Sequence, residues 1–383
     1  MIEKTWDPNR INDQIQLRAI QRRRPLSCTL ELTYRCNFRC RMCYVRMSDV
    51  QAAPYGRIRT VDEWLGMAKQ LFDAGVLYLM LTGGECTQYP GFENLYEELA
   101  RMGFRITVMT NAGAFTDGVR DVFRRYPPSN VGITVYGGSN ETYASVTGDP
   151  KGYDKVVENI RFFQSLKVNV GLNFTIIRQN VMDYPKVEAL CKELGLRYSL
   201  ITDITGHRHD VTMSDALECR LTPAERVCVV CHPPEEVAQA MENARELEKE
   251  LVNFKRPDIP ERISHSEMDS CIGSKTACAI YWNGEMQTCI DMNGWHNLHP
   301  FETGFEAAWA QLKAEEKETF RRPPVCQQCS MEKDCLHNCA GRRFEGTGST
   351  NEPDPYTCQY TYLLKKYKEQ RKHTDIPKEP QCV

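Results

Sequence analysis

Three cysteines stand close together near the start of the chain. Cys36, Cys40 and Cys43 have the spacing C-x3-C-x2-C and follow an apolar segment, residues 26–33, that has the character of a strand. Cysteine thiolates are the usual ligands of iron–sulfur clusters, and a cubane cluster has four irons. Three thiolates leave one iron without a protein ligand, and an open metal position is where a substrate or cosubstrate binds.

A second group follows the next apolar run, residues 76–81, and reads Gly83-Gly84-Glu85. Glycines let the backbone approach a ligand closely, and a carboxylate beside them can accept hydrogen bonds from a cationic amine. Alone, Gly-Gly-Glu is usually an ordinary turn. Its position one strand–helix unit after the three cysteines makes it a candidate binding site.

Cysteines become dense again in the last third of the chain. Their order is a cysteine pair before Gly284-x4-Cys289, then C-x2-C-x5-C-x3-C and a final cysteine. The eight positions are Cys271, Cys278, Cys289, Cys326, Cys329, Cys335, Cys339 and Cys358. Eight thiolates can close two four-cysteine cubanes, and zinc ribbons, which also use C-x2-C pairs, are the alternative.

Together these motifs resemble the radical S-adenosylmethionine (radical SAM) enzymes that carry a C-terminal SPASM domain. The resemblance implies an N-terminal segment (1–25), a barrel (26–205), a bridging region (206–264), a SPASM domain (265–360) and a C-terminal helix with tail (361–383). In that family the three-cysteine cluster chelates the amino and carboxylate groups of SAM. Reductive cleavage of SAM then gives a 5′-deoxyadenosyl radical that abstracts hydrogen from a substrate.

The resemblance also implies roles for individual residues. The SAM-binding [4Fe–4S] cluster would be held by Cys36, Cys40 and Cys43. The SAM contacts would be Met42, Gly83, Gly84, Glu85, Asn111, Thr134 and Asn173. Auxiliary [4Fe–4S] cluster I would take Cys271, Cys278, Cys289 and Cys339, and auxiliary cluster II would take Cys326, Cys329, Cys335 and Cys358.

Two positions depart from the family pattern. Cys86 stands where the family usually has proline, and Cys278 lies nearer to Gly284 than expected. If Cys278 is not a ligand, auxiliary cluster I has an open iron that could bind substrate directly.

Alternating apolar runs and amphipathic segments must position these residues. Strands are predicted over 26–33, 76–81, 104–109, 131–135, 168–177 and 197–201, and helices over 60–75, 91–102, 117–125, 152–166 and 183–194. Thr60 and Glu63 form a capping box at the first of these helices, and Gly75 ends it. Six repeats predict an α/β fold with a parallel sheet and outer helices. They fit the family's partial (β/α)6 barrel, whose site lies at the C-terminal ends of the strands.

The bridging region holds two further groups. One is His207-Arg208-His209 near Asp210, and the other, Cys228-x2-Cys231-His232, is the string C-x-x-C-H used to attach haem. Covalent haem needs an extracytoplasmic setting that the chain does not indicate. A zinc site that includes Cys219 is the alternative to free thiols.

Two local predictions complete the C-terminal half. Residues 234–256, rich in Glu, Lys, Ala and Leu, predict a solvated helix. Residues 281–285 predict a hairpin with Asn-Gly as its two-residue turn, which would bring Cys278 and Cys289 close together. A basic helix is predicted over 360–372.

Composition limits the setting and the partners. The chain has 383 residues, of which 41% are hydrophobic, and this length predicts two or three domains. The net charge of −3 argues against nucleic acid or an anionic membrane as a partner. No apolar run is long enough to span a membrane, and the first residues lack a signal peptide. We therefore expect a cytoplasmic protein whose eighteen cysteines are largely metal ligands rather than disulfides.

The function that the resemblance implies is that of a peptide maturase. The radical would abstract hydrogen from a ribosomally made peptide, the auxiliary clusters would accept the electron released when a new bond forms, and flavodoxin or ferredoxin would supply reductant. A sulfatase maturase would carry aspartate directly after Cys289. Here Ile290 takes that place and Asp291 follows, which turns the carboxylate to the other face of an extended segment.

Asp291 remains the candidate general base. Two other classes stay open. One is a radical SAM enzyme that oxidises a small molecule of porphyrin or aminoglycoside type, and the other is a non-catalytic electron carrier or zinc scaffold.

Overall fold

The computed structural model of the protein describes residues 8–206, 215–255, 271–292, 294–327, 329–331, 335 and 339–370. His207, Arg208, His209 and Asp210 lie outside the described residues. The centre of the fold is one eight-stranded sheet with the order β6-β5-β4-β3-β2-β1-β7-β8.

The first six strands confirm the predicted α/β architecture. They are β1 (Ser27–Glu31), β2 (Tyr78–Thr82), β3 (Arg105–Thr110), β4 (Asn130–Val135), β5 (Asn169–Thr175) and β6 (Tyr198–Ile201). Every neighbouring pair among them is parallel. Because connections between parallel strands cross over through helices, all six carboxyl ends meet at one edge of the sheet.

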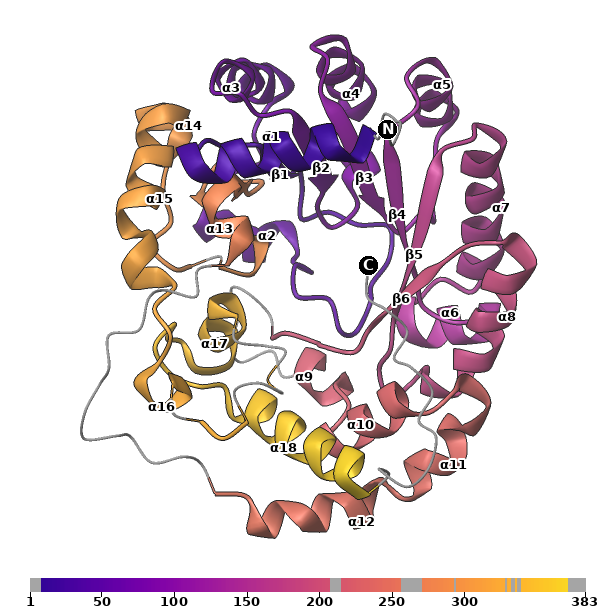
Figure 1. Cartoon of the computed structure of the whole chain (residues 1–383). Coiled ribbons are helices and arrows are strands. Elements are labelled where there is room, and N and C mark those ends of the chain that lie inside the picture. Colours follow the sequence, from indigo (N-terminus) through magenta and orange to yellow (C-terminus); the bar gives the residue numbers. More distant parts are fainter. Residues whose placement is uncertain are drawn as a thin grey trace, which may run out of the picture.

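The helices between these strands form an outer arc over one face of the sheet (Figure 1). They are α3 (Val61–Asp73), α4 (Phe92–Arg101), α5 (Asp117–Arg125), α7 (Gly152–Ser165) and α8 (Tyr184–Leu194), while α6 (Asn140–Thr147) lies inside this arc. The sequence analysis missed α6, which Ser139 caps at its start and Gly148 ends in the left-handed conformation.

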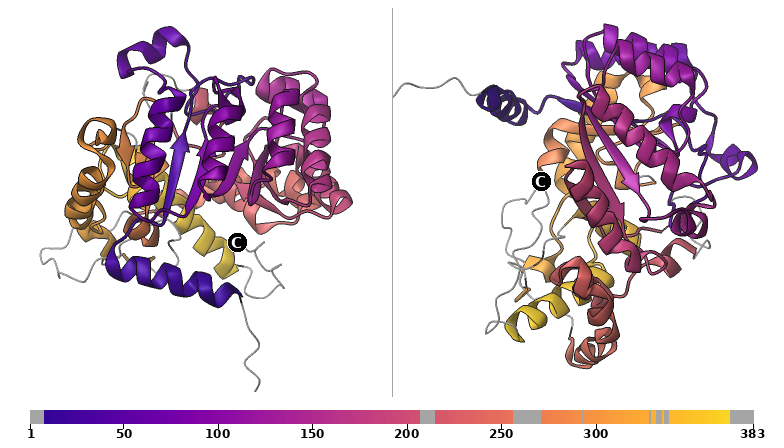
Figure 2. Two further views of the ribbon diagram at one scale, coloured as in Figure 1. Left: turned by 90° about the horizontal axis from the view of Figure 1, so that it is seen from above. Right: turned by 90° about the vertical axis from the view of Figure 1, so that its right-hand side faces the viewer.

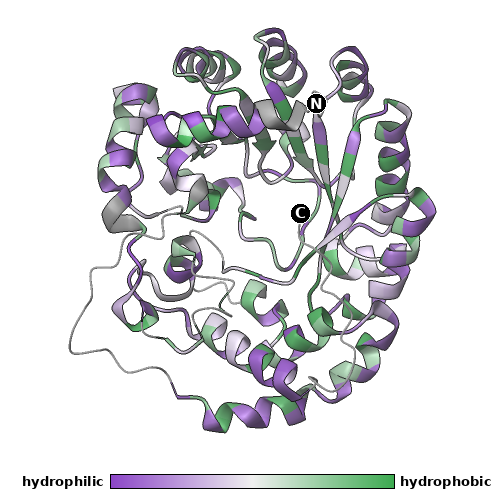
Figure 3. Ribbon diagram, viewed as in Figure 1, coloured by the Kyte–Doolittle hydropathy of each residue, from purple (hydrophilic) through white to green (hydrophobic). Residues whose placement is uncertain are grey.

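Helix α3 shows why these segments fold as they do. Thr60 accepts a hydrogen bond from the Glu63 backbone N–H, and the Glu63 carboxylate accepts one from the Thr60 N–H, as the predicted capping box requires. Trp64 and Leu71 are fully buried against the sheet. Apolar residues accordingly follow the strands and polar residues cover the outer helix surfaces (Figure 3).

The C-terminal half extends the sheet, which the sequence analysis did not predict. Strand β7 (Ala277–Ile280) pairs with β1 in parallel, and β8 (Met286–Gln287) pairs with β7 antiparallel. The C-terminal segments drawn in orange therefore lie beside β1, at the opposite edge from β6 (Figure 2). The predicted boundary near residue 265 is thus not a boundary in the sheet.

The bridging region differs from its prediction. Instead of one solvated helix, residues 234–253 form four short pieces, and Asn243 both ends one helix and starts the next. Ala240 and Ala244 are buried in a separate apolar cluster with Val227 and Leu363. The pieces are therefore a packed layer rather than a solvent-exposed rod.

The remaining elements surround this core. They are α1 (Pro8–Arg22), α2 (Asp49–Ala52), α9 (Asp215–Cys219), α10 (Pro223–Cys231), α11 (Val237–Glu242), α12 (Ala244–Lys249), α13 (Ile272–Thr276), α14 (Pro300–Thr303), α15 (Phe305–Thr319), α16 (Pro324–Gln327), α17 (Ala340–Thr347) and α18 (Pro355–Gln370), with 3-10 turns η1 (Ala53–Tyr55), η2 (Cys86–Gln88), η3 (Val181–Asp183), η4 (Pro234–Glu236), η5 (Glu250–Asn253) and η6 (Ile290–Met292). Among the described residues, no helix combines the length and apolarity needed to cross a membrane.

The central strand gives a stability prediction. Leu30 is fully buried on β1, between Leu81 of β2 and Ile280 of β7. We expect Leu30→Ala to lower the free energy of unfolding by about 2–5 kcal/mol, because it leaves a cavity in the core. Met182→Ala, at a residue 58% exposed, is the control and should change it by less than about 0.5 kcal/mol. If urea unfolding shows that both variants lose the same free energy of unfolding, the placement of β1 in the core is contradicted.

Candidate active site

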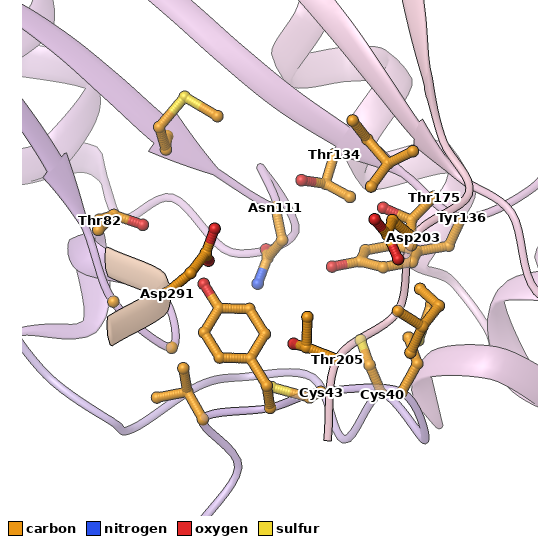
Figure 4. A pocket seen from close by; sticks show the side chains of 18 of the residues that line it. Cys40, Cys43, Thr82, Asn111, Thr134, Tyr136, Thr175, Asp203, Thr205 and Asp291 are labelled. Carbon is orange, nitrogen blue, oxygen red and sulfur yellow. The ribbon is translucent and has the colours of Figure 1, made fainter. Parts of the chain in front are cut away.

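A cavity of about 290 Å³ lies at the carboxyl ends of the barrel strands. Its walls come from the cysteine loop, from the ends of β2 to β6 and from the C-terminal half of the chain. Figure 4 shows several of these side chains around one central space. The lining includes Cys40, Met42, Cys43, Gly83, Gly84, Asn111, Thr134 and Asp291, so eight residues predicted from the sequence meet here.

Helix α6 fixes the cysteine loop. The backbone N–H groups of Arg39 and Arg41 donate to the carbonyl oxygens of Thr147 and Val146, at 2.8 and 3.3 Å. Phe38, buried in the same loop, contacts the rings of two tyrosines edge-on. These contacts attach the cysteine loop to the barrel, so its position is fixed by the protein.

The three thiols of the loop lie in each other's electrostatic field. Burial, then the charge of Glu85, raises the pKa of the Cys36 thiol to about 12. Burial, together with Cys43 and Cys36, raises the pKa of Cys40 well above its usual range. The raised pKa values mean that the thiols prefer to stay protonated. Metal coordination favours the thiolate instead, so the loop suits a positively charged centre.

The glycines provide a rim without side chains. A Cβ on Gly83 would lie 2.6 Å from the Thr33 carbonyl oxygen, and one on Gly84 would lie 2.5 Å from those of Tyr34 and Arg35. The Gly84 N–H donates to the Thr33 carbonyl at 2.6 Å. Glycine is thus required where this turn packs on the strand that leads into the cysteine loop.

Glu85 lies behind this rim and is not among the residues that line the cavity. Its buried carboxylate accepts hydrogen bonds from the Thr87 N–H and hydroxyl, the Thr110 hydroxyl and the Asn111 N–H, at 2.7–3.2 Å. Burial raises its pKa, and these hydrogen bonds oppose that shift. The carboxylate therefore joins the segments that follow β2 and β3, while Gly83 and Gly84 form the cavity wall in front of it.

Asn111 connects the Glu85 carboxylate to the cysteine loop. Its side-chain Nδ2 donates to the Cys36 Sγ at 3.3 Å and to the Asn37 Oδ1 at 2.9 Å. Amide donors to a ligand sulfur tune the potential of an iron–sulfur centre. Asn111 can therefore act on a cluster as well as on a cosubstrate.

Two predicted contacts differ in their placement. Thr134 lines the cavity. Asn173 is its register partner on β5 and lies one strand away, outside the lining.

Sequence reasoning missed Tyr136, Asp203 and Arg342, which also line the cavity. Asp203 is the second residue after β6, and Asn111 is the first after β3, so its position after a strand was a usable signal. No comparable signal marks Arg342.

The C-terminal cysteines fall into two groups. Cys326, Cys329, Cys335 and Cys358 line one small cavity of about 50 Å³, as expected for a shared site. Burial, then the charge of Asp291, raises the pKa of Cys289 to about 12, and Cys339 and Cys271 add to that shift, so both thiols lie within electrostatic range of Cys289. Within the described part of the chain, no three His, Cys, Asp or Glu side chains are already arranged to hold a metal ion. Thiol rotamers would have to turn toward one.

Cys278 is not with the others. It is the register partner of Cys28 on β1, both thiols are buried in the apolar core, and the Cys278 thiol donates to the Ser27 carbonyl oxygen at 4.0 Å. The hairpin explains this, because β7 and β8 pair Ala279 with Gln287 and Ile280 with Met286. The turn between them is longer than two residues, so Cys278 and Cys289 do not face each other.

The C-x-x-C-H string forms a structural contact. The His232 Nδ1 lies 2.8 Å from the Cys228 carbonyl oxygen, and its Nε2 lies 2.8 Å from the Tyr367 hydroxyl. Both ring nitrogens are engaged, so His232 offers no free nitrogen to zinc or haem iron.

The fold and the cavity define a parallel α/β partial barrel with a cysteine loop at the carboxyl ends of its strands. Residues 30–191 match the Radical SAM superfamily. The chain therefore contains a radical SAM domain.

Two relatives and one solved structure extend this finding. The antilisterial bacteriocin subtilosin biosynthesis protein AlbA of Bacillus subtilis (strain 168) is 24% identical over 49% of this chain and 42% of its own length. The AdoMet-dependent heme synthase of Methanosarcina barkeri (strain Fusaro / DSM 804) is 22% identical over 86% of this chain and 95% of its own. The structure of Streptococcus suis SuiB bound to precursor peptide SuiA has a TM-score of 0.62, 17% identity, and coverage of 94% and 83%.

The glycine rim gives a second prediction. Gly84→Ala places a methyl group against backbone carbonyl oxygens that cannot rotate away. We expect the free energy of unfolding to fall by about 1–3 kcal/mol. The matched control is Gly66→Ala on α3, where a Cβ meets nothing within 4 Å, and where alanine should raise it by about 0.5–1 kcal/mol. If urea unfolding gives Gly84→Ala the same free energy of unfolding as the wild type, the close contact between Gly84 and the backbone carbonyl oxygens is refuted.

Proposed function

We propose that this chain is a radical SAM enzyme that modifies a peptide. The observation that carries the proposal is that one cavity is lined by the cysteine loop, by the Gly83–Gly84 rim, and by Asp291 and Arg342 from the cysteine-rich C-terminal half. A site for generating a radical and a site for controlling its product thus share one space.

The residues that line the cavity would have different roles. A [4Fe–4S] cluster on Cys36, Cys40 and Cys43 would supply the electron that cleaves bound SAM to a 5′-deoxyadenosyl radical. The Gly83–Gly84 backbone would bind the amino group of SAM, and Met42 and Thr134 would bind its nucleoside part. Asn111 would hold Cys36 in position through its amide.

The C-terminal cysteines would accept the electron released when the new bond forms. Auxiliary cluster II would use Cys326, Cys329, Cys335 and Cys358, which share one cavity. Auxiliary cluster I would use Cys271, Cys289 and Cys339, and not Cys278. Asp291 lines the reaction cavity and would serve as the general base.

Peptide is favoured as the substrate class by two comparisons. AlbA is named for the biosynthesis of a bacteriocin, and the SuiB structure holds a precursor peptide. The aligned part of AlbA is less than half of that protein, so AlbA supports a peptide substrate by similarity alone.

The second candidate is oxidation of a small molecule of porphyrin type. The heme synthase aligns over most of this chain, which favours that reading. The sulfatase-maturase alternative is weaker, because Ile290 stands in the position after Cys289.

The cluster assignment predicts metal content and SAM cleavage. After anaerobic reconstitution and reduction, the wild type should hold about 12 iron per chain and form 5′-deoxyadenosine. The triple variant Cys36→Ala/Cys40→Ala/Cys43→Ala should lose about 4 iron and all SAM cleavage. Cys191→Ala, a buried thiol on α8, is the control and should lose neither. Zinc in place of iron in the C-terminal sites would overturn the electron-acceptor role.

The placement of Cys278 gives a separate test. Cys278→Ala should keep the full iron content, because that thiol contacts Cys28. Cys289→Ala should lose up to about 4 iron, since its thiol lies with Cys271 and Cys339. Equal iron losses in the two variants, measured by metal analysis and Mössbauer spectroscopy, would restore Cys278 as a ligand.

A further inference from the structure

One carboxylate in the cavity has an unused oxygen. Asp203 follows β6, and its side chain is 15% exposed and lines the cavity. Its Oδ2 is buried and has no hydrogen-bond partner among the described residues. A buried acceptor without a partner costs roughly 1–3 kcal/mol, so the position calls for a ligand that donates.

Two arginines lie on either side of this carboxylate. The Arg226 Nη1 lies 3.7 Å from the Asp203 Oδ1, and the Arg342 Nε lies 3.4 Å from Oδ2 without hydrogen-bond geometry. Arg226 is itself buried, and its Nε donates to the Thr202 hydroxyl at 3.0 Å. The two guanidinium groups thus fix the orientation of the carboxylate and leave its Oδ2 as a hydrogen-bond acceptor.

Arg342 offers the complementary group. Its Nη1 donates to the Glu345 carboxylate at 3.3 Å, which fixes the guanidinium from the far side. Its neighbour Gly341 packs against Asp291, since a Cβ there would lie 3.2 Å from the Asp291 Cβ. Arg342 thus begins beside Asp291 and reaches Asp203, while the two aspartates enter the cavity from different sides (Figure 4). A guanidinium has five N–H donors, and these contacts leave some of them for a ligand.

We propose that Asp203 and Arg342 together bind the backbone of an extended peptide beside the reacting residue. In a paired strand, the N–H and C=O of one residue point to the same side and are bound by one acceptor and one donor. Asp203 Oδ2 supplies the acceptor and Arg342 supplies the donor, from opposite halves of the chain. The pair therefore recognises peptide backbone irrespective of side chain. This inference rests on the proposed function and narrows its substrate to a segment with a free amide N–H.

The test follows hydrogen from substrate to cofactor. The reconstituted full chain is given SAM, dithionite and a pool of random heptapeptides made from perdeuterated amino acids, and the deuterated fraction of the 5′-deoxyadenosine is measured by mass spectrometry. We expect Asp203→Asn to lower that fraction roughly tenfold, because one charge-assisted hydrogen bond is lost. Wild type should show a similar fall with a pool whose backbone amides are N-methylated.

Two variants separate ligand binding from a structural ion pair. Arg342→Lys keeps the charge but loses the planar donor edge, so it should also lower the deuterated fraction. Asp121→Asn removes an exposed carboxylate from an arginine on α5 and is the matched control, with no change expected. Iron content and melting temperature are recorded for each variant, and only proteins that match the wild type in both are compared.

Several outcomes would overturn the inference. They are an unchanged fraction in Asp203→Asn, full retention of it in Arg342→Lys, equal transfer from N-methylated peptides or from free perdeuterated amino acids, or no transfer from the peptide pool to wild type. If wild type forms no 5′-deoxyadenosine at all, the proposed function itself fails. If it forms 5′-deoxyadenosine but the variants behave like wild type, only the peptide-binding role fails.

Discussion

The site depends on the buried carboxylate of Glu85. Four protein hydrogen bonds converge on it, two from Thr87 in η2 and two from Thr110 and Asn111 at the end of β3, and an ionised group in such a place is tolerated only when it is fully hydrogen-bonded. Because one donor is the backbone N–H of Asn111, the carboxylate also sets where the Asn111 amide meets the Cys36 sulfur. The glycine rim and the cysteine loop thus share one anchor behind the cavity.

Much of this arrangement could be predicted from the sequence because it is local. The capping box of α3, the apolar runs of the six strands and the spacing of the cysteines each depend on nearby residues. Parallel strands then place their carboxyl ends together, so residues after different strands meet without any knowledge of contacts. Asn111 and Thr134 could be predicted for that reason, and Asp203 satisfied the same rule.

What the sequence could not give depends on register and on partners far along the chain. Cys278 fits a spacing pattern, yet a side chain's face is fixed by strand pairing, and a one-residue difference turns it to the other side. The pairing of β7 with β1 places it against Cys28, 250 positions away in the chain. Similarly, the hydrogen bonds that hold the Glu85 carboxylate could not be predicted, because two of their donors, Thr110 and Asn111, come from the end of another strand.

The pairing of β7 with β1 also has a consequence for the chemistry. It ties the start of the cysteine-rich region to the strand that leads into the radical SAM cysteines. At the opposite edge, Arg342 contacts Asp203 after β6, so the same region is held at both ends of the barrel sheet. A cysteine-rich region fixed at two edges has little freedom to move as a unit. Under the proposed function, the distance between the cysteine loop and the C-terminal cysteines would therefore be set by the fold, and the substrate would bind between them.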